Sequence, residues 1–143
     1  MKYIREVQVK YGKKVPIVEA IRSPQQVADF IRKKVLTTNA KEHLIVLCLD
    51  GNHDVIAYNT IGIGTATSCT FHPREVFQPA IAVGSVSIIL AHNHPSNNNE
   101  PSKEDLAVTK LAKECSKMLG IKFLDHIIIT DTEHYSFQDK GKL

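Results

Sequence analysis

The sequence has no long hydrophobic run and little net charge. No stretch of its 143 residues approaches about 18 consecutive apolar residues, so we expect no membrane-spanning helix and no membrane partner. The first residues, Met1 to Glu6, lack the apolar core of a signal peptide, and this favours a cytoplasmic protein. The net charge of +3 is mild, so we expect the basic residues to form solvated surface rather than a nucleic-acid-binding stripe.

The sequence also lacks paired cysteines. Cys48, Cys69 and Cys115 are odd in number and widely spaced, without a Cys-x-x-Cys pair, which argues against a disulfide framework or a redox motif. Cys48 lies in an apolar run, so we expect reduced thiols. Hydrophobic residues make up 43% and charged residues 23% of the chain. This balance, with the length, predicts one globular domain over residues 1–143.

The periodicity of the apolar residues predicts a single mixed α/β fold. Alternation predicts an opening strand from Tyr3 to Tyr11. Ser23 followed by proline predicts a helix start, and a second helix is expected at Pro73, short or kinked because of Pro79. Further strands are expected over residues 44–49, 55–59, 85–91, 121–130 and 135–137. The order, with one hairpin and one helical crossover, indicates a mixed sheet flanked by helices.

Two histidines follow the expected strand over residues 85–91. His92 and His94 are two residues apart, so in an extended backbone both imidazoles leave the same face, roughly 6 to 7 Å apart, and can bind one ion. The alternative is ordinary hydrogen bonding in a polar loop. His126 falls in a later strand. It could support the ligands or be a hydrogen-bonded core histidine, and we favour the second interpretation.

The longest helix is predicted between Ser102 and Gly120. Its expected core face consists of Val108, Leu111, Ala112, Cys115, Met118 and Leu119. Asp105 lies on that face, and because a buried carboxylate is costly unless it is paired or bound to a metal, it is a candidate third ligand. A position in the first helical turn, where the helix dipole stabilises a negative charge, explains Asp105 equally well without a metal. Ser102 is equally well explained as an N-cap.

The four residues share one motif: His-x-His, then seven residues, then Ser, then two residues, then Asp. This spacing resembles the JAMM motif of the JAB/MPN metalloprotease family. Residues 72–77, 88–96 and 124–129 are similar to signature segments of its RadC branch, so the resemblance covers about residues 16 to 138. Members of this branch commonly carry an N-terminal helix-hairpin-helix region, which we expect this chain to lack. Asn97, Asn98 and Asn99 stand where glycine is common after the Pro-Ser of the motif, a departure that leaves the expected ligands untouched.

The resemblance implies a cytidine-deaminase-like α/β fold of the JAB/MPN type. It implies that His92, His94 and Asp105 bind one Zn²⁺ with a water as the fourth ligand. It also implies that Ser102 stabilises an oxyanion.

The resemblance further implies an upstream glutamate as general base, and two glutamates compete for that role. Glu42 directly precedes the strand that begins at His43, where members of the family carry their acid, and we favour it. Glu75, in the segment His72 to Phe77, is the alternative and has a second interpretation as a helix-start residue.

The expected zinc ligands, the glutamate and Ser102 together predict zinc-dependent hydrolysis of an amide or isopeptide bond in a peptide or protein tail. Zinc lowers the pKa of water to about 7, and the glutamate removes the proton before attack on the carbonyl. The alternatives are a DNA-repair-associated accessory protein, as the RadC name suggests, a metal-dependent nuclease, and a domain in which zinc is structural. A nucleoside deaminase is excluded, since its His-x-Glu and Pro-Cys-x-x-Cys signature is absent.

Overall fold

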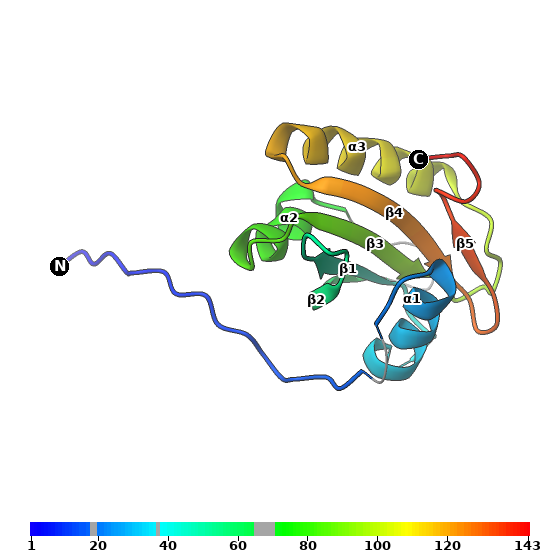
Figure 1. Ribbon diagram of the computed structural model, residues 1–143, viewed down its shortest axis with the longest axis horizontal. Helices are drawn as coiled ribbons and strands as arrows, with labels where there is room; N and C mark the ends of the chain where they lie inside the picture. Colours follow the sequence, from blue (N-terminus) through cyan, green and yellow to red (C-terminus); the bar gives the residue numbers. More distant parts are fainter. Residues whose placement is uncertain (18–19, 37, 65–70) are drawn as a thin grey trace.

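The centre of the fold is a five-stranded sheet in the order β2-β1-β3-β4-β5 (Figure 1). The computed structural model describes residues 1–17, 20–36, 38–64 and 71–143. The strands are β1 (His43–Leu49), β2 (Val55–Ile63), β3 (Ser87–Asn93), β4 (Lys122–Ile129) and β5 (His134–Ser136). β1 pairs antiparallel with β2 and β3, β4 pairs parallel with β3, and β5 pairs antiparallel with β4. The expected mixed sheet, with one hairpin and one helical crossover, is confirmed.

Helices cover both faces of the sheet. They are α1 (Pro24–Phe30), which continues into the π-helical turn η1 (Ile31–Val35), α2 (Pro73–Ala82) and α3 (Lys103–Leu119). Val27 of α1 packs with Ile45 and Leu47 of β1 on one face. Val76 of α2 packs with Val46 of β1 on the other, where α3 also lies. All seven residues of β1 are therefore buried, as its unbroken apolar sequence predicts.

The starts of α1 and α2 agree with their sequence signals. Ser23 is the N-cap of α1, and its hydroxyl oxygen accepts a hydrogen bond of 3.2 Å from the backbone N–H of Gln26. Pro73 opens α2, which is short at 10 residues and runs through Pro79 to Ala82. Cys69 and the rest of residues 65–70 lie outside the described residues.

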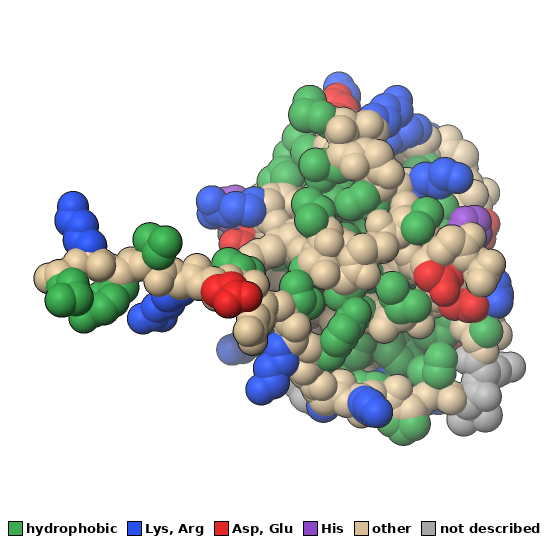
Figure 2. Space-filling view, turned by 60° about the vertical axis from the view of Figure 1, so that its left-hand side comes forward, with side chains coloured by type: hydrophobic (Ala, Val, Ile, Leu, Met, Phe, Trp, Pro, Cys, Tyr) green, Lys and Arg blue, Asp and Glu red, His purple; other side chains and the backbone are tan. Residues whose placement is uncertain are grey.

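The predicted opening strand is wrong. Residues 1–17 contain no strand. The first of them project away from the body of the molecule (Figure 1), whereas residues 9–17 line a pocket with residues of α1, β2 and α2. Tyr3 is 80% exposed and Val7 is 89% exposed, and Figure 2 shows hydrophobic and basic side chains along this segment. Alternation of side chains predicts a face but supplies no neighbour, and a strand forms only where a partner satisfies its N–H and C=O groups.

The predicted core face of α3 is wrong in part. The buried residues of α3 are Asp105, Thr109, Ala112 and Ser116, whereas Met118 is 89% exposed and Leu111 is 41% exposed. The inward stripe is thus rotated toward polar residues. Thr109 and Ser116 tolerate burial because their hydroxyls donate to carbonyls of the helix itself, those of Asp105 at 2.8 Å and Lys113 at 2.8 Å.

No helix in the described part of the chain has the length and apolar composition needed to span a membrane.

Candidate metal centre

The two histidines reach the site from the end of β3. Ile88 and Leu90 of β3 face the layer formed by α2 and α3, so the period of two places His92 on that same side, followed by His94. His92 is 3% exposed, and the His94 backbone N–H donates to the carbonyl of Ile129 at 2.9 Å. This bond prolongs the pairing of β3 with β4 and fixes the direction in which the second imidazole leaves the sheet.

The third candidate ligand comes from the first turn of α3. Ser102 is the N-cap, and its hydroxyl oxygen accepts from the backbone N–H of Asp105 at 3.1 Å. Asp105 Oδ2 accepts from the backbone N–H of Ser102 at 2.9 Å in return. This reciprocal capping box holds the carboxylate at the mouth of the helix, so the N-cap interpretation of Ser102 is confirmed.

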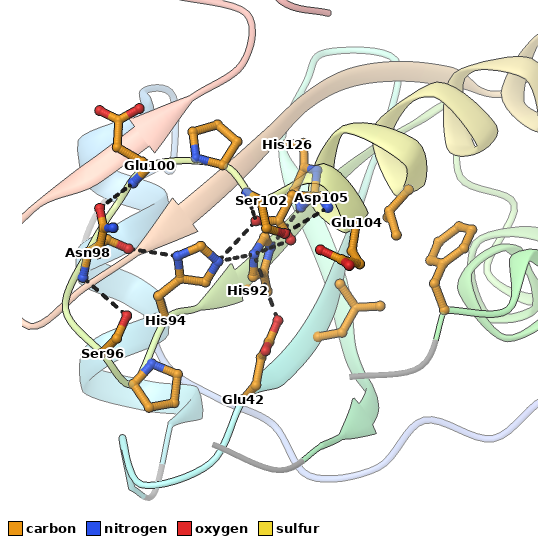
Figure 3. A pocket seen from close by; sticks show the side chains of 15 residues that line it. Glu42, His92, His94, Ser96, Asn98, Glu100, Ser102, Glu104, Asp105 and His126 are labelled. Carbon is orange, nitrogen blue, oxygen red and sulfur yellow. Dashed lines mark hydrogen bonds and ion pairs between the residues drawn. The ribbon is translucent and has the colours of Figure 1, made fainter. Parts of the chain in front are cut away.

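Three side chains expected to share an ion converge on one point (Figure 3). His92 Nε2 lies 2.9 Å from His94 Nε2 and 3.1 Å from Asp105 Oδ1. His94 Nε2 lies 3.0 Å from Asp105 Oδ2. With a carboxylate oxygen of Glu42, one ligand atom from each of these four residues lies within 4.8 Å of every other. The structure therefore brings together the three predicted ligands and one of the two predicted glutamates.

The hydrogen bond on the far side of His94 shows which of its ring nitrogens is free to bind a metal. His94 Nδ1 lies 2.7 Å from the carbonyl oxygen of Asn98. Because a carbonyl only accepts, Nδ1 carries the hydrogen and donates it, and the neutral ring then has a free lone pair on Nε2. That lone pair points at the Asp105 carboxylate, so acceptor faces acceptor unless a cation or a proton lies between them.

The donor set and its spacing fit a zinc ion. Bonds of about 2.0 to 2.1 Å in a tetrahedral site place neighbouring donor atoms about 3.3 Å apart. The three separations among His92, His94 and Asp105 are 2.9, 3.0 and 3.1 Å, so a small outward shift of each side chain admits the ion. Two imidazoles and one carboxylate are also a donor set of catalytic zinc, with a fourth position left for water.

Glu42 stands at the edge of this cluster. It precedes β1, whose residue Leu44 pairs with His92 across the sheet, and its Oε1 lies 3.9 Å from His92 Nε2. Glu42 is 9% exposed. Burial raises the pKa of its carboxyl and nearby Asp105 adds to this, against the opposing effect of His92 and His94, and the net pKa is raised. A carboxyl with a raised pKa can both take and return a proton.

Glu75 lies elsewhere. It is in the first turn of α2, where its side chain is 47% exposed and lies 4.0 Å from Arg74. It is not among the residues that line the pocket at the metal centre.

Electrostatics within the cluster favour a charged carboxylate. Burial acts to raise the pKa of Asp105, but the neighbouring imidazoles of His92 and His94 outweigh this effect, and the net pKa lies below its ordinary value. Burial acts to lower the pKa of His94, but its bonds to Asp105 and to the Asn98 carbonyl raise it overall.

Two residues lie behind the ligands, of which sequence reasoning named His126 and missed Thr109. His126 Nε2 lies 2.8 Å from His92 Nδ1, and His126 Nδ1 lies 2.6 Å from Thr109 Oγ1. His126 is thus a buried, hydrogen-bonded core histidine, as favoured, and it also contacts the candidate ligand His92, as the alternative requires. Burial lowers its pKa well below the ordinary value, and its ring stacks on Phe137 with 4.8 Å between centroids. The sequence carries no signal for these contacts, since they depend on the parallel pairing of β3 with β4.

A pocket of about 530 Å³ opens onto the cluster. One wall is apolar and consists of Leu44, Phe71 and Val108. Polar residues of the loop before α3, including Ser96 and Asn98, form another (Figure 3). A bound molecule can therefore lie against apolar surface on one side of the candidate metal position and reach hydrogen-bonding groups on the other.

Comparison with known proteins matches most of the chain. The family model for the RadC-like JAB domain matches residues 21–142. A UPF0758 protein of Clostridium acetobutylicum is 43% identical over 123 residues, which cover 86% of this chain and 53% of that protein. A UPF0758 protein of Staphylococcus haemolyticus is 45% identical over 121 residues, covering 85% of this chain and 53% of that protein.

A more distant relative extends the match. A UPF0758 protein of Pelobacter propionicus is 38% identical over 132 residues, covering 92% of this chain and 57% of that protein. The chain thus spans about half the length of the curated relatives it matches.

Proposed function

The chain belongs to the RadC-like JAB domain family, and from this premise we propose that it is a zinc-dependent hydrolase of amide or isopeptide bonds. The observation that carries the proposal is the convergence of His92 Nε2, His94 Nε2 and the Asp105 carboxylate, at 2.9 to 3.1 Å from one another, with Glu42 beside them. When bound, zinc supplies a Lewis acid that polarises a carbonyl and lowers the pKa of water.

Glu42 is the proposed general base. Its Oε1 lies 3.9 Å from His92 Nε2, farther than the ligand atoms lie from one another, and this extra distance leaves room for a water molecule at the carboxylate. The raised pKa of Glu42 suits a group that takes a proton from water and passes it to the departing amine. A positioned acid or base of this kind contributes about 10²- to 10⁴-fold to a rate.

Ser102 is the proposed oxyanion donor. Its oxygen is occupied as an acceptor by the Asp105 N–H, and among the described residues its hydroxyl hydrogen has no acceptor. Ser102 lines the pocket and is exposed, so the hydroxyl can donate to a substrate oxygen that gains negative charge. One such donor is worth about 3 to 4 kcal/mol at the transition state.

The pocket favours an extended polypeptide as substrate. Leu44, Phe71 and Val108 offer an apolar wall for a side chain next to the cleaved bond, while the loop after His94 offers polar atoms for a peptide backbone. Burial of one aliphatic side chain on such a wall contributes about 1.5 to 3 kcal/mol, and this energy can hold the carbonyl against the metal centre.

A digest of a peptide library tests the proposal. Wild-type protein treated with chelator and then with zinc is compared with the His92→Ala variant treated in the same way. We expect cleavage that disappears with chelator, returns with zinc and is absent from the variant. Cleavage by chelated protein, or equal cleavage by both proteins, would contradict the proposal.

A further inference from the structure

A chain of hydrogen bonds runs from the candidate metal ligands back into the helix that carries one of them. His92 Nδ1 lies 2.8 Å from His126 Nε2. His126 Nδ1 lies 2.6 Å from Thr109 Oγ1, and the Thr109 hydroxyl lies 2.8 Å from the backbone carbonyl of Asp105. His126 is 1% exposed and Thr109 is 4% exposed, so water cannot replace any member of the chain.

The direction of each hydrogen bond is fixed by the carbonyl at its end. The Asp105 carbonyl can only accept, so the Thr109 hydroxyl donates its single hydrogen there. Its oxygen must then accept from His126, which places the hydrogen of that ring on Nδ1. The neutral His126 ring consequently accepts at Nε2, and His92 must donate its Nδ1 hydrogen to it.

The consequence lies on the opposite side of the His92 ring. With its one hydrogen on Nδ1, neutral His92 has a free lone pair on Nε2, the atom that lies 3.1 Å from Asp105 Oδ1 and 2.9 Å from His94 Nε2. The opposite tautomer would carry a hydrogen on Nε2 and could not bind a metal there. The ligands His92 and Asp105 are therefore joined twice, once across the metal position and once through His126 and Thr109.

We propose that Thr109 and His126 are positioning residues that set the tautomer of His92 and so make its Nε2 available to a divalent cation. The proposal rests on the proposed function for the identity of the ligands, but the tautomer exists in the metal-free protein and is measured there. The tautomer of His94 is set more simply, by the hydrogen bond from its Nδ1 to the Asn98 carbonyl. His92 needs the longer chain because its neighbour is another histidine, which accepts or donates equally well.

The tautomers are measured first in the wild type. Ring ¹⁵N chemical shifts of the metal-free full chain, recorded at a pH where each ring carries one hydrogen, distinguish Nδ1–H from Nε2–H. We expect Nδ1–H for both His126 and His92. An Nε2–H tautomer at either ring would overturn the proposal, whether or not the protein binds zinc or cleaves peptides.

Substitution of Thr109 then tests whether its hydroxyl sets the direction of the hydrogen bonds through His126 to His92. Thr109→Val removes the hydroxyl at nearly constant shape and leaves His126 Nδ1–H without an acceptor. We expect the two rings to shift toward Nε2–H and the zinc affinity to fall on the order of 10- to 100-fold, as for other residues that support metal ligands. Thr109→Ser keeps the hydroxyl, and we expect it to bind zinc within about threefold of the wild type, well short of the loss that removal of such a support causes.

Ser116→Ala is the matched control. Ser116 is buried on the same helix and also donates to a helix carbonyl, but no hydrogen bond joins it to a histidine. We expect it to leave zinc affinity and ring tautomers unchanged. If Ser116→Ala weakens zinc binding as much as Thr109→Val, or if Thr109→Val lowers only the unfolding temperature, the role of Thr109 is structural and the proposal is wrong.

Discussion

His92 Nε2 lies 3.1 Å from Asp105 Oδ1, although one residue ends a central strand and the other opens a helix. Both residues are buried, at 3% and 7% exposure. Removal of either residue from the three candidate ligands leaves too few donor atoms for a zinc ion. The contact thus joins sheet and helix at the point where we expect the metal.

His92→Ala should abolish stoichiometric zinc binding. Two remaining ligands, one histidine and one carboxylate, do not make a catalytic zinc site. Zinc content after dialysis, measured by atomic emission, should fall from about one ion per chain to below about one tenth. His72→Ala is the control, since His72 is exposed and makes no side-chain cap at α2. Equal zinc in wild type and His92→Ala would refute the assignment of this ligand.

Glu42→Gln should lose hydrolysis and keep zinc. The amide preserves the shape of the side chain but cannot accept a proton, so the rate on a cleaved peptide should fall about 10²- to 10⁴-fold. Glu75→Gln, at an exposed position outside the pocket, should cleave at the wild-type rate. A slow Glu75→Gln beside a fast Glu42→Gln would transfer the role of base to Glu75.

Substitutions of Ser102 should separate capping from catalysis. Ser102→Ala removes both the N-cap and the hydroxyl, with a cost of about 0.5 to 2 kcal/mol in stability, whereas glycine at an N-cap costs only a few tenths. Ser102→Gly should therefore unfold close to the wild type and still lose about 10²- to 10³-fold in rate. Urea unfolding and peptide cleavage measure the two effects. Full activity of Ser102→Gly would exclude the hydroxyl as an oxyanion donor.

Cys48 should make the stability of the protein depend on alkaline pH. Burial raises the pKa of its thiol from 9.0 to about 11, so the folded state favours the neutral form. The stability that this preference contributes is fully present below pH 9 and is lost as the pH rises through 11. The free energy of unfolding falls by at most about 1.4 kcal/mol per pH unit in this range. Urea unfolding between pH 8 and 10.5 should show a shallower decline for Cys48→Ala. The same decline in both proteins would contradict the raised pKa.

The sheet and most of its helices could be predicted because each has a local signal. The unbroken apolar run of β1, the capping serine at Ser23 and the glycine at the end of α3 report burial or chain reversal directly. The opening strand could not be excluded locally, since Tyr3 and Val7 alternate as in a strand but have no partner in space. The core face of α3 was misplaced because Thr109 and Ser116 bury their hydroxyls by bonding their own helix.

The candidate ligands could be predicted because their residue types and spacing carry the chemistry. Support of the ligands by His126 was one of two open interpretations. Its contacts with His92 and Thr109 could not be predicted, because they depend on the register that places Leu90 beside His126 across two parallel strands and on a threonine 17 residues away in sequence. A pattern within one segment contains no information about such a contact. That Glu42 rather than Glu75 lies beside His92 likewise depends on the pairing of β1 with β3, which sequence spacing leaves open.

X-ray absorption at the zinc edge of the zinc-loaded protein tests the central claim most directly. Two imidazole nitrogens and two oxygens, one from Asp105 and one from water, should surround one zinc at about 2.0 to 2.1 Å. Any zinc that His94→Ala still binds should show one imidazole neighbour instead of two. A sulfur neighbour at about 2.3 Å, or a zinc without histidine neighbours, would show that the ion binds elsewhere and would contradict the account.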